Sequence, residues 1–205
     1  QEEVLANLAK VQHAGAVVIV SYPRIAGATG LPARVWVITE YERRRGKLSF
    51  EKAKADLEEK GLGDHVIVLN ESSATVAEAA HALGVEPASI AKTLSVLQGE
   101  KPVLIVTEGT AKLDNHKYKS LFHIKAKMIP YDEVEAYVGH APGGVCPFGV
   151  NEGVAVYLDE SLRKFDTVYP AAGNGHTAVK LTLQELEAAA GAEGWVDVCK
   201  EPEGK

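Results

Sequence analysis

The chain has 205 residues and a formal net charge of −6, and 46% of its residues are hydrophobic. This length allows one substantial core, and the acidic balance argues against a protein that coats nucleic acid non-specifically. The longest apolar run, residues 14–20, is too short to cross a bilayer, and no basic segment precedes it as in a signal peptide. Two cysteines far apart in the sequence favour free thiols. We therefore expect a cytoplasmic protein without a membrane partner.

The first 46 residues differ in pattern from the rest of the chain. They predict a helix over 2–11 and a strand over 35–38, separated by a Gly/Pro-rich stretch at 22–32. No pattern of chemically reactive residues occurs here. We expect residues 1–46 to be an N-terminal extension of unknown role and residues 47–205 to form a single domain.

From residue 48 onward, helices and strands follow one another without a strict strand–helix–strand rhythm. Thr75 and Glu78 have the spacing of a capping box, and Gly84 ends the helix that they begin. Further helices are predicted over 49–61, 114–122, 131–139 and 183–191, and strands over 65–69, 93–97, 102–107, 153–159, 167–171 and 178–182. This order favours an α+β (mixed α/β) domain with a central, largely antiparallel sheet flanked by helices.

The stretch 140–149, His-Ala-Pro-Gly-Gly-Val-Cys-Pro-Phe-Gly, crowds prolines and glycines around a cysteine. Gly143 and Gly144 lack a Cβ, so backbone N–H groups can approach a ligand closely. Pro142 and Pro147 fix φ on both sides and stiffen the loop. The stretch is either a rigid backbone support for a ligand or an ordinary surface loop.

Cys146 and His140 in the same loop raise the possibility of a thiolate nucleophile with an imidazole base. That chemistry needs the two side chains within hydrogen-bond reach and a third group that orients the imidazole. Cysteine is also a common small buried hydrophobe. Cys146, Cys199 and the histidines show no spacing typical of zinc, so no metal site is expected.

Two further features concern lysines. Lys92 lies inside an apolar run, where it either extends its ammonium to the surface or serves as a point charge for a phosphate. The segment 111–128 holds five lysines and one aspartate, a local charge of +4 in an acidic chain. Its lysines are either a solvated helix face or contacts to a nucleic-acid backbone.

The order and spacing of four segments resemble the YbaK/prolyl-tRNA-synthetase-associated family, the trans-acting aminoacyl-tRNA editing domains. The segments are 72–94, which contains Lys92, then 112–122, 143–149 and 156–175. The lysine of the Ala-Lys-Thr-Leu run and the Gly-x-x-x-Pro loop from Gly143 to Pro147 are its most specific marks. The resemblance covers roughly three quarters of the chain and does not include residues 1–46.

The resemblance implies a cofactor-independent hydrolase that cleaves the ester of a small amino acid mischarged onto a tRNA, with tRNA-Pro as the expected tRNA. The implied partners are the tRNA acceptor end and prolyl-tRNA synthetase. The implied catalytic residues are Lys92, Gly143, Gly144 and Pro147. The implied substrate-binding residues are Thr75, His140, Val145, Cys146, Gly173 and Asn174, with tRNA contacts at Lys112, Lys117 and Lys119.

One departure from the family pattern affects the amino-acid pocket. Residues 171–175 read Ala-Ala-Gly-Asn-Gly, where many members carry small polar residues and a basic residue. Alanine offers no side-chain hydrogen bond, so the sequence does not identify the rejected amino acid. Two alternatives stay open: a non-catalytic module that docks on tRNA or a synthetase, and a cysteine hydrolase that uses Cys146 and His140.

Overall fold

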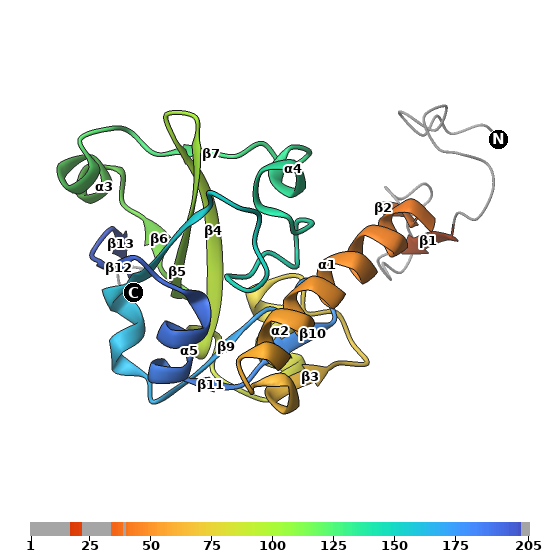
Figure 1. Cartoon of the computed structure of the whole chain (residues 1–205). Helices are drawn as coiled ribbons and strands as arrows, with labels where there is room; N and C mark the ends of the chain where they lie inside the picture. Colours follow the sequence, from red (N-terminus) through yellow and green to blue (C-terminus); the bar gives the residue numbers. More distant parts are fainter. Residues whose placement is uncertain (1–16, 22–33, 39, 202–205) are drawn as a thin grey trace, which may run out of the picture. The chain divides into compact units, whose positions relative to one another are not determined.

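The apolar runs predicted as strands come together in a seven-stranded sheet within residues 46–205 (Figure 1). The computed structural model describes residues 17–21, 34–38 and 40–201, and it describes side chains from residue 47 onward. Residues 1–45 form a separate compact unit, whose described strands β1 (Val17–Ser21) and β2 (Arg34–Ile38) pair with each other. The helix predicted over 2–11 lies outside the described residues. No helix in the described part of the chain is long and apolar enough to span a bilayer.

The main sheet contains strands of both directions. In spatial order its strands are β11 (Leu181–Thr182), β9 (Thr167–Pro170), β4 (Ile90–Gln98), β5 (Lys101–Glu108), β8 (Ala155–Asp159) and β12 (Gly194–Val196), with β7 (Lys127–Met128) paired to β4. The pairs β4–β9, β5–β8 and β8–β12 are parallel, and the remaining pairs of this sheet are antiparallel. The predicted class, a mixed fold of helices and strands around a central sheet, is confirmed.

The hairpin of β4 and β5 forms the longest pairing in the sheet. Its register runs from Ala91 opposite Glu108 to Gln98 opposite Lys101. Gly99 has a φ of +66°, which glycine adopts without strain, so a two-residue turn closes the hairpin. The strands predicted over 93–97 and 102–107 are confirmed, and both extend further than predicted.

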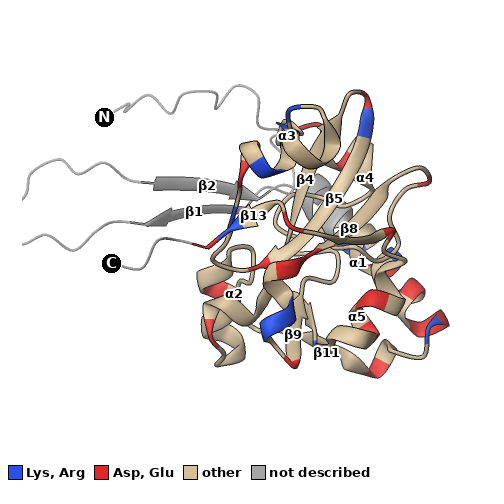
Figure 2. Ribbon diagram, turned by 90° about the vertical axis from the view of Figure 1, so that its left-hand side faces the viewer, with Lys and Arg blue, Asp and Glu red and all other residues tan. Residues whose placement is uncertain are grey.

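Helices cover both faces of the sheet. The helices among the described residues are α1 (Glu40–Glu59), α2 (Val76–Leu83), α3 (Asn115–Phe122), α4 (Val134–Val138) and α5 (Leu183–Ala190). Buried side chains of α1, α4 and α5 pack on one face, and Tyr118 of α3 packs on the other. α2 packs against Ile90 at the start of β4. Figure 2 shows acidic residues on α2 and α5. The sides of these two helices away from their buried residues face the solvent.

Short elements complete the fold and bring distant segments together. Strand β3 pairs with β10, and β6 pairs with β13, each antiparallel. These elements are η2 (Gly63–His65), β3 (Val66–Val68), η3 (Pro87–Ser89), β6 (Lys112–Leu113), η4 (Glu160–Lys164), β10 (Thr177–Val179) and β13 (Cys199–Lys200).

Several predicted boundaries differ from the structure. The strand predicted over 178–182 is interrupted at Lys180, whose backbone N–H donates to the carbonyl of His65 at 3.1 Å. The chain therefore changes partner there, from β3 to β9. The helix predicted over 131–139 shortens to α4, which Gly139 ends with a φ of +89°. The capping box of Thr75 and Glu78 is confirmed, as is the left-handed Gly84.

Tyr118 supplies a test of the packing under α3. Its side chain is fully buried, and its hydroxyl has no hydrogen-bond partner among the described residues. An unsatisfied buried hydroxyl costs stability. Tyr118→Phe should therefore raise the free energy of unfolding by about 1 kcal/mol in urea titrations.

Tyr157→Phe is the matched control for this change. The Tyr157 hydroxyl donates to Glu193 Oε2 at 2.7 Å, so its removal should lower stability or leave it unchanged. A loss of stability in Tyr118→Phe as large as that in Tyr157→Phe would contradict this account of the α3 packing.

Candidate active site

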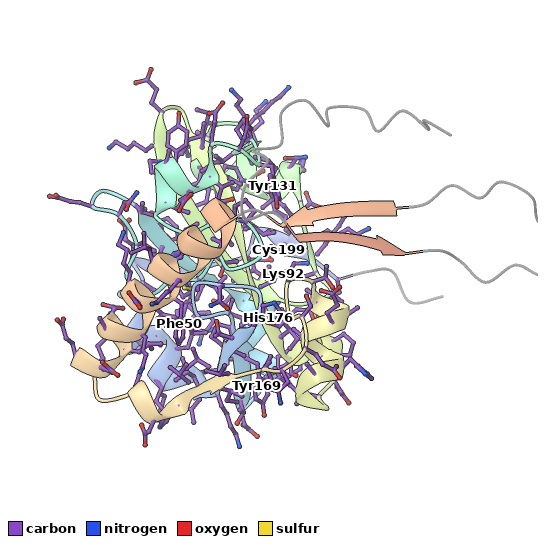
Figure 3. All side chains as sticks on the ribbon, turned by 90° about the vertical axis from the view of Figure 1, so that its right-hand side faces the viewer. Phe50, Lys92, Tyr131, Tyr169, His176 and Cys199 are labelled. Atoms are coloured by element: carbon purple, nitrogen blue, oxygen red, sulfur yellow. The ribbon has the colours of Figure 1, made fainter. Side chains whose placement is uncertain are left out.

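A pocket opens where one edge of β4 has no neighbouring strand. On this edge, β9 pairs with Ile90 and Ala91, and β7 pairs with Val96 and Leu97. Residues 92–95 lie between these two partners. A cavity of about 380 Å³ occupies the position. In Figure 3, Lys92 lies between Tyr131 and Tyr169, and all three residues line the cavity.

The backbone of Thr93 points into this opening. The carbonyl of Ser95 accepts a hydrogen bond from the N–H of Ile129 at 3.1 Å, so alternate residues of β4 direct their peptide groups toward this edge. Ala91, two residues before Thr93, makes the contact with β9. The peptide groups of Thr93 are thus directed at the cavity, where a ligand can reach them.

Lys92 is half-buried at the same position. Its Nζ donates to the carbonyl oxygen of Gly109 at 2.9 Å and also to that of Ala111. Burial lowers the pKa of Lys92, and the nearby Cys199 and Glu108 act in the opposite direction. An ammonium has three N–H donors, and two carbonyls fix its place. Lys92 is therefore a cation held by the backbone on the wall of the cavity.

The inner wall of the cavity combines small apolar side chains with two unsatisfied hydroxyls. Ser73 Oγ and Thr93 Oγ1 are buried and have no hydrogen-bond partner among the described residues. Both residues line the cavity. A buried hydroxyl without a partner is costly, and a polar ligand in the cavity would satisfy it. The apolar part of this wall includes Ala74, Ala79, Ala91, Ala171 and Ala178.

The 140–149 loop reaches the cavity with only part of its length. Pro142, Gly143 and Val145 line the wall, and Gly143 has a φ of +84°. Gly144 is buried, and a Cβ there would lie 2.4 Å from the backbone of Asn174. Glycine at 144 is therefore required because this loop packs directly on the loop that contains Asn174.

His140 and Cys146 lie behind the cavity wall, and both side chains are fully buried. His140 Nε2 donates to the carbonyl of Phe148 at 2.7 Å, and its Nδ1 accepts from the hydroxyl of Ser49 at 2.9 Å. The carbonyl can only accept, so the proton of the neutral imidazole is on Nε2. His140 therefore connects the two ends of the loop and ties them to α1.

This geometry argues against a cysteine nucleophile. Cys146 Sγ lies 3.6 Å from His140 Nε2, the nitrogen that already carries a proton. Burial raises the pKa of the Cys146 thiol to about 12 and lowers the pKa of His140 to about 4. A protonated thiol beside a ring nitrogen that cannot accept its proton is not an activated nucleophile. The two residues support the loop from inside.

The loop that contains Gly173 and Asn174 also supports the wall from outside the cavity. Gly173 has a φ of +89°, and a Cβ there would lie 2.4 Å from the carbonyl oxygen of Ser49. Asn174 Oδ1 accepts from the N–H of His176 at 2.9 Å and from the hydroxyl of Thr177 at 3.1 Å. Thr177 lines the cavity, so Asn174 holds a lining residue in place without lining the cavity itself.

The lysines predicted to contact tRNA lie on β6 and α3. These elements pack on the face of the sheet opposite α1. Lys112 and Lys119 are exposed. Lys117 donates to Asp197 Oδ1 at 2.6 Å and to the carbonyl of Cys199 at 3.0 Å, and the Asp197 contact raises its pKa. Lys117 thus joins α3 to the C-terminal segment as well as carrying charge.

The structure brings together Thr75, Lys92, Gly143 and Val145 on one cavity wall. It places His140, Gly144, Cys146, Pro147, Gly173 and Asn174 among the residues that do not line the cavity. The sequence reasoning did not identify Ser73 or Thr93. Strand alternation places Thr93 on the face opposite Lys92, and only the open edge lets one cavity reach both.

Comparisons with known proteins identify the family of this chain. The model of the aminoacyl-tRNA editing domain matches residues 70–189. The chain is 47% identical over 131 residues to the uncharacterized protein YwhH of Bacillus subtilis. The matched region covers 63% of this chain and 83% of YwhH.

Two further relatives carry functional names. The chain is 31% identical over 110 residues to EbsC of Enterococcus faecalis, a candidate Cys-tRNA(Pro)/Cys-tRNA(Cys) deacylase, covering 52% of this chain and 66% of EbsC. It is similar to the crystal structure of a candidate trans-editing enzyme for prolyl tRNA synthetase, with a TM-score of 0.68 and 32% identity. That match covers 74% of this chain and 97% of the other.

The buried His140 predicts a pH-dependent stability. Its pKa is about 4 in the folded chain and about 6.5 when unfolded, so acidification favours the unfolded state as the pH falls from 6.5 to 4. The difference amounts to about 3 kcal/mol of stability lost between pH 7 and pH 4. His140→Gln removes this titration, so its stability deficit against the wild type should shrink by that amount in urea titrations at the two pH values.

An NMR titration of the His140 ring in the wild type gives an independent readout. A midpoint near 6.5, or a stability deficit that is the same at both pH values, would show that His140 is not held neutral in the folded chain.

Proposed function

Because the chain belongs to the aminoacyl-tRNA editing domain family, we propose that it is a trans-acting deacylase for mischarged tRNA. Residues 47–205 form the editing domain in this proposal, and residues 1–46 are an extension. The ester of a small amino acid on tRNA-Pro is the proposed substrate. The observation that carries the proposal is the placement of Lys92 and Gly143 on the wall of one cavity, beside unsatisfied hydroxyls.

The proposed reaction needs no covalent intermediate. Water attacks the ester carbonyl, the bond to the ribose oxygen breaks, and that oxygen takes a proton as the hydroxyl of the tRNA leaves. Negative charge develops on the carbonyl oxygen and on the leaving oxygen. A fixed ammonium and backbone N–H groups stabilise such charge without reorganising. Lys92, held by the carbonyls of Gly109 and Ala111, and the backbone at Gly143 would supply these groups.

An aminoacyl ester is already activated compared with an amide. Positioning and electrostatic stabilisation can lower its barrier by several kcal/mol. This supports a mechanism in which Gly143, Gly144 and Pro147 act through loop shape. In the same mechanism, Cys146 and His140 hold the loop and take no chemical part.

The small-substrate proposal rests on the composition of the inner wall. The alanines and Val145 leave room for a short side chain, and about 380 Å³ is near the lower end of ligand pockets. Ser73 and Thr93 offer hydroxyls to the amino group or side chain of the substrate. Among the described lining residues there is no carboxylate, so these hydroxyls and the Thr93 carbonyl are the groups available to the amino group.

The tRNA body would be held outside this cavity. Lys112 and Lys119 are exposed and are proposed as phosphate contacts. Lys117 is paired with Asp197, so in this proposal it contacts a phosphate by exchanging that partner. Association with prolyl-tRNA synthetase is proposed from the structural relative whose description includes that enzyme.

Lys92→Ala tests the reaction directly. The wild type is assayed on tRNAs charged with Ala, Cys, Ser, Thr or Pro, and it should hydrolyse Ala- or Cys-tRNA-Pro faster than Pro-tRNA-Pro. On the fastest substrate, Lys92→Ala should lower kcat/KM by about 100-fold, as expected for the loss of one electrostatic group. The variant should still melt cooperatively, at a lower temperature than the wild type, because the ammonium satisfies the carbonyls of the buried residues Gly109 and Ala111.

Cys146→Ala is the control variant in the same assay. It removes the thiol and leaves the cavity wall intact, so it should retain turnover within about threefold of the wild type. A folded Cys146→Ala protein without activity, together with an active Lys92→Ala protein, would replace this proposal with the cysteine hydrolase. A wild type that binds aminoacyl-tRNA and hydrolyses none of the panel would favour the non-catalytic module.

A further inference from the structure

Two large apolar side chains lie exposed at the rim of the cavity. Tyr131 has 77% of its surface exposed and Met128 has 52%, and both line the cavity. The other large hydrophobic residues that are exposed in the described part of the chain, such as Val68, do not line it. Tyr169 also lines the cavity but packs against the α2 cluster, so it belongs to the wall. Tyr131 and Met128 are therefore free to contact a ligand that extends out of the cavity.

The shape of the proposed substrate determines which part of the aminoacyl-tRNA extends out of the cavity. If the ester lies beside Lys92 and Gly143, the amino acid occupies the inner wall of alanines and hydroxyls. The ribose and base of the terminal nucleotide must then leave through the mouth. A base presents a flat apolar face, and stacking on an aromatic ring is a common way for proteins to hold an unpaired base. Thioether sulfur also makes favourable contacts with aromatic faces.

The charged residues beside the rim indicate the side from which the nucleic-acid strand reaches the cavity. Lys125 and Lys127 precede Met128 and are exposed, while Asp132 and Glu133 follow Tyr131 and are exposed. Phosphates are attracted to the first pair and repelled by the second. The strand would therefore approach the cavity over the segment before β7 and would avoid the start of α4.

We propose that Tyr131 and Met128 form a stacking platform for the base of the 3′-terminal nucleotide of the tRNA, with Lys125 and Lys127 beside the preceding phosphates. This inference rests on the proposed function, because it takes the ester to lie beside Lys92. It assigns the binding of the base to residues 128–131, at the end of β7 and before α4.

Steady-state deacylation of Tyr131→Ala and Tyr131→Phe tests the platform. Loss of the ring should raise KM by about 5- to 100-fold, the range for removing one base-stacking side chain, while kcat changes little. Tyr131→Phe keeps the ring and should behave like the wild type. Val68→Ala, which shortens an exposed side chain away from the cavity, is the matched control and should have no effect.

A binding experiment with deacylated tRNA separates this inference from the proposed function. The tRNA carries 2-aminopurine in place of its 3′-terminal adenine, and wild-type protein and Tyr131→Phe should quench its fluorescence. Tyr131→Ala should quench it much less. Unchanged quenching and unchanged KM in Tyr131→Ala would overturn the platform even if the wild type hydrolyses aminoacyl-tRNA. A wild type that quenches but hydrolyses nothing would overturn the proposed function and keep the platform.

Discussion

The gap in pairing along one edge of β4 is the constraint on which the site depends. β9 and β7 both pair with this strand, yet each covers only one end of it. Between them, the peptide groups of Thr93 have no strand partner on this edge, which leaves space for a cavity. Backbone groups that are not satisfied by a strand are satisfied by water or by a ligand. The gap therefore explains why Lys92 and Thr93, neighbours on opposite faces, reach one cavity.

The residues around this gap divide into a wall and a support. Gly143 belongs to the wall, and His140, Gly144 and Cys146 hold the loop behind it. The contacts of His140 with Ser49 and Phe148 connect the loop to α1. A rigid support is consistent with chemistry by fixed backbone groups, because such groups stabilise charge only when their positions are maintained.

The sequence predicted the main helices, the β4–β5 hairpin and the capping box because periodicity, turn residues and caps are local signals. It also indicated Lys92 and the loop that begins at Gly143. It did not predict where β9 and β7 stop pairing, so the roles of Ser73 and Thr93 could not be seen. The sequence left open whether His140 and Cys146 lie close together, and their burial depends on α1, which lies about 90 residues earlier in the chain. Local patterns do not contain such contacts.

Binding of a substrate analogue that cannot be hydrolysed tests the central claim most directly. Alanine joined by an amide to 3′-amino-3′-deoxyadenosine keeps the shape of the aminoacyl ester. In ¹H–¹⁵N spectra of assigned protein, the account predicts the largest shifts at the amides of Lys92, Thr93 and Gly143. Shifts confined to residues away from this cavity, such as those around His65 and Lys180, would contradict it.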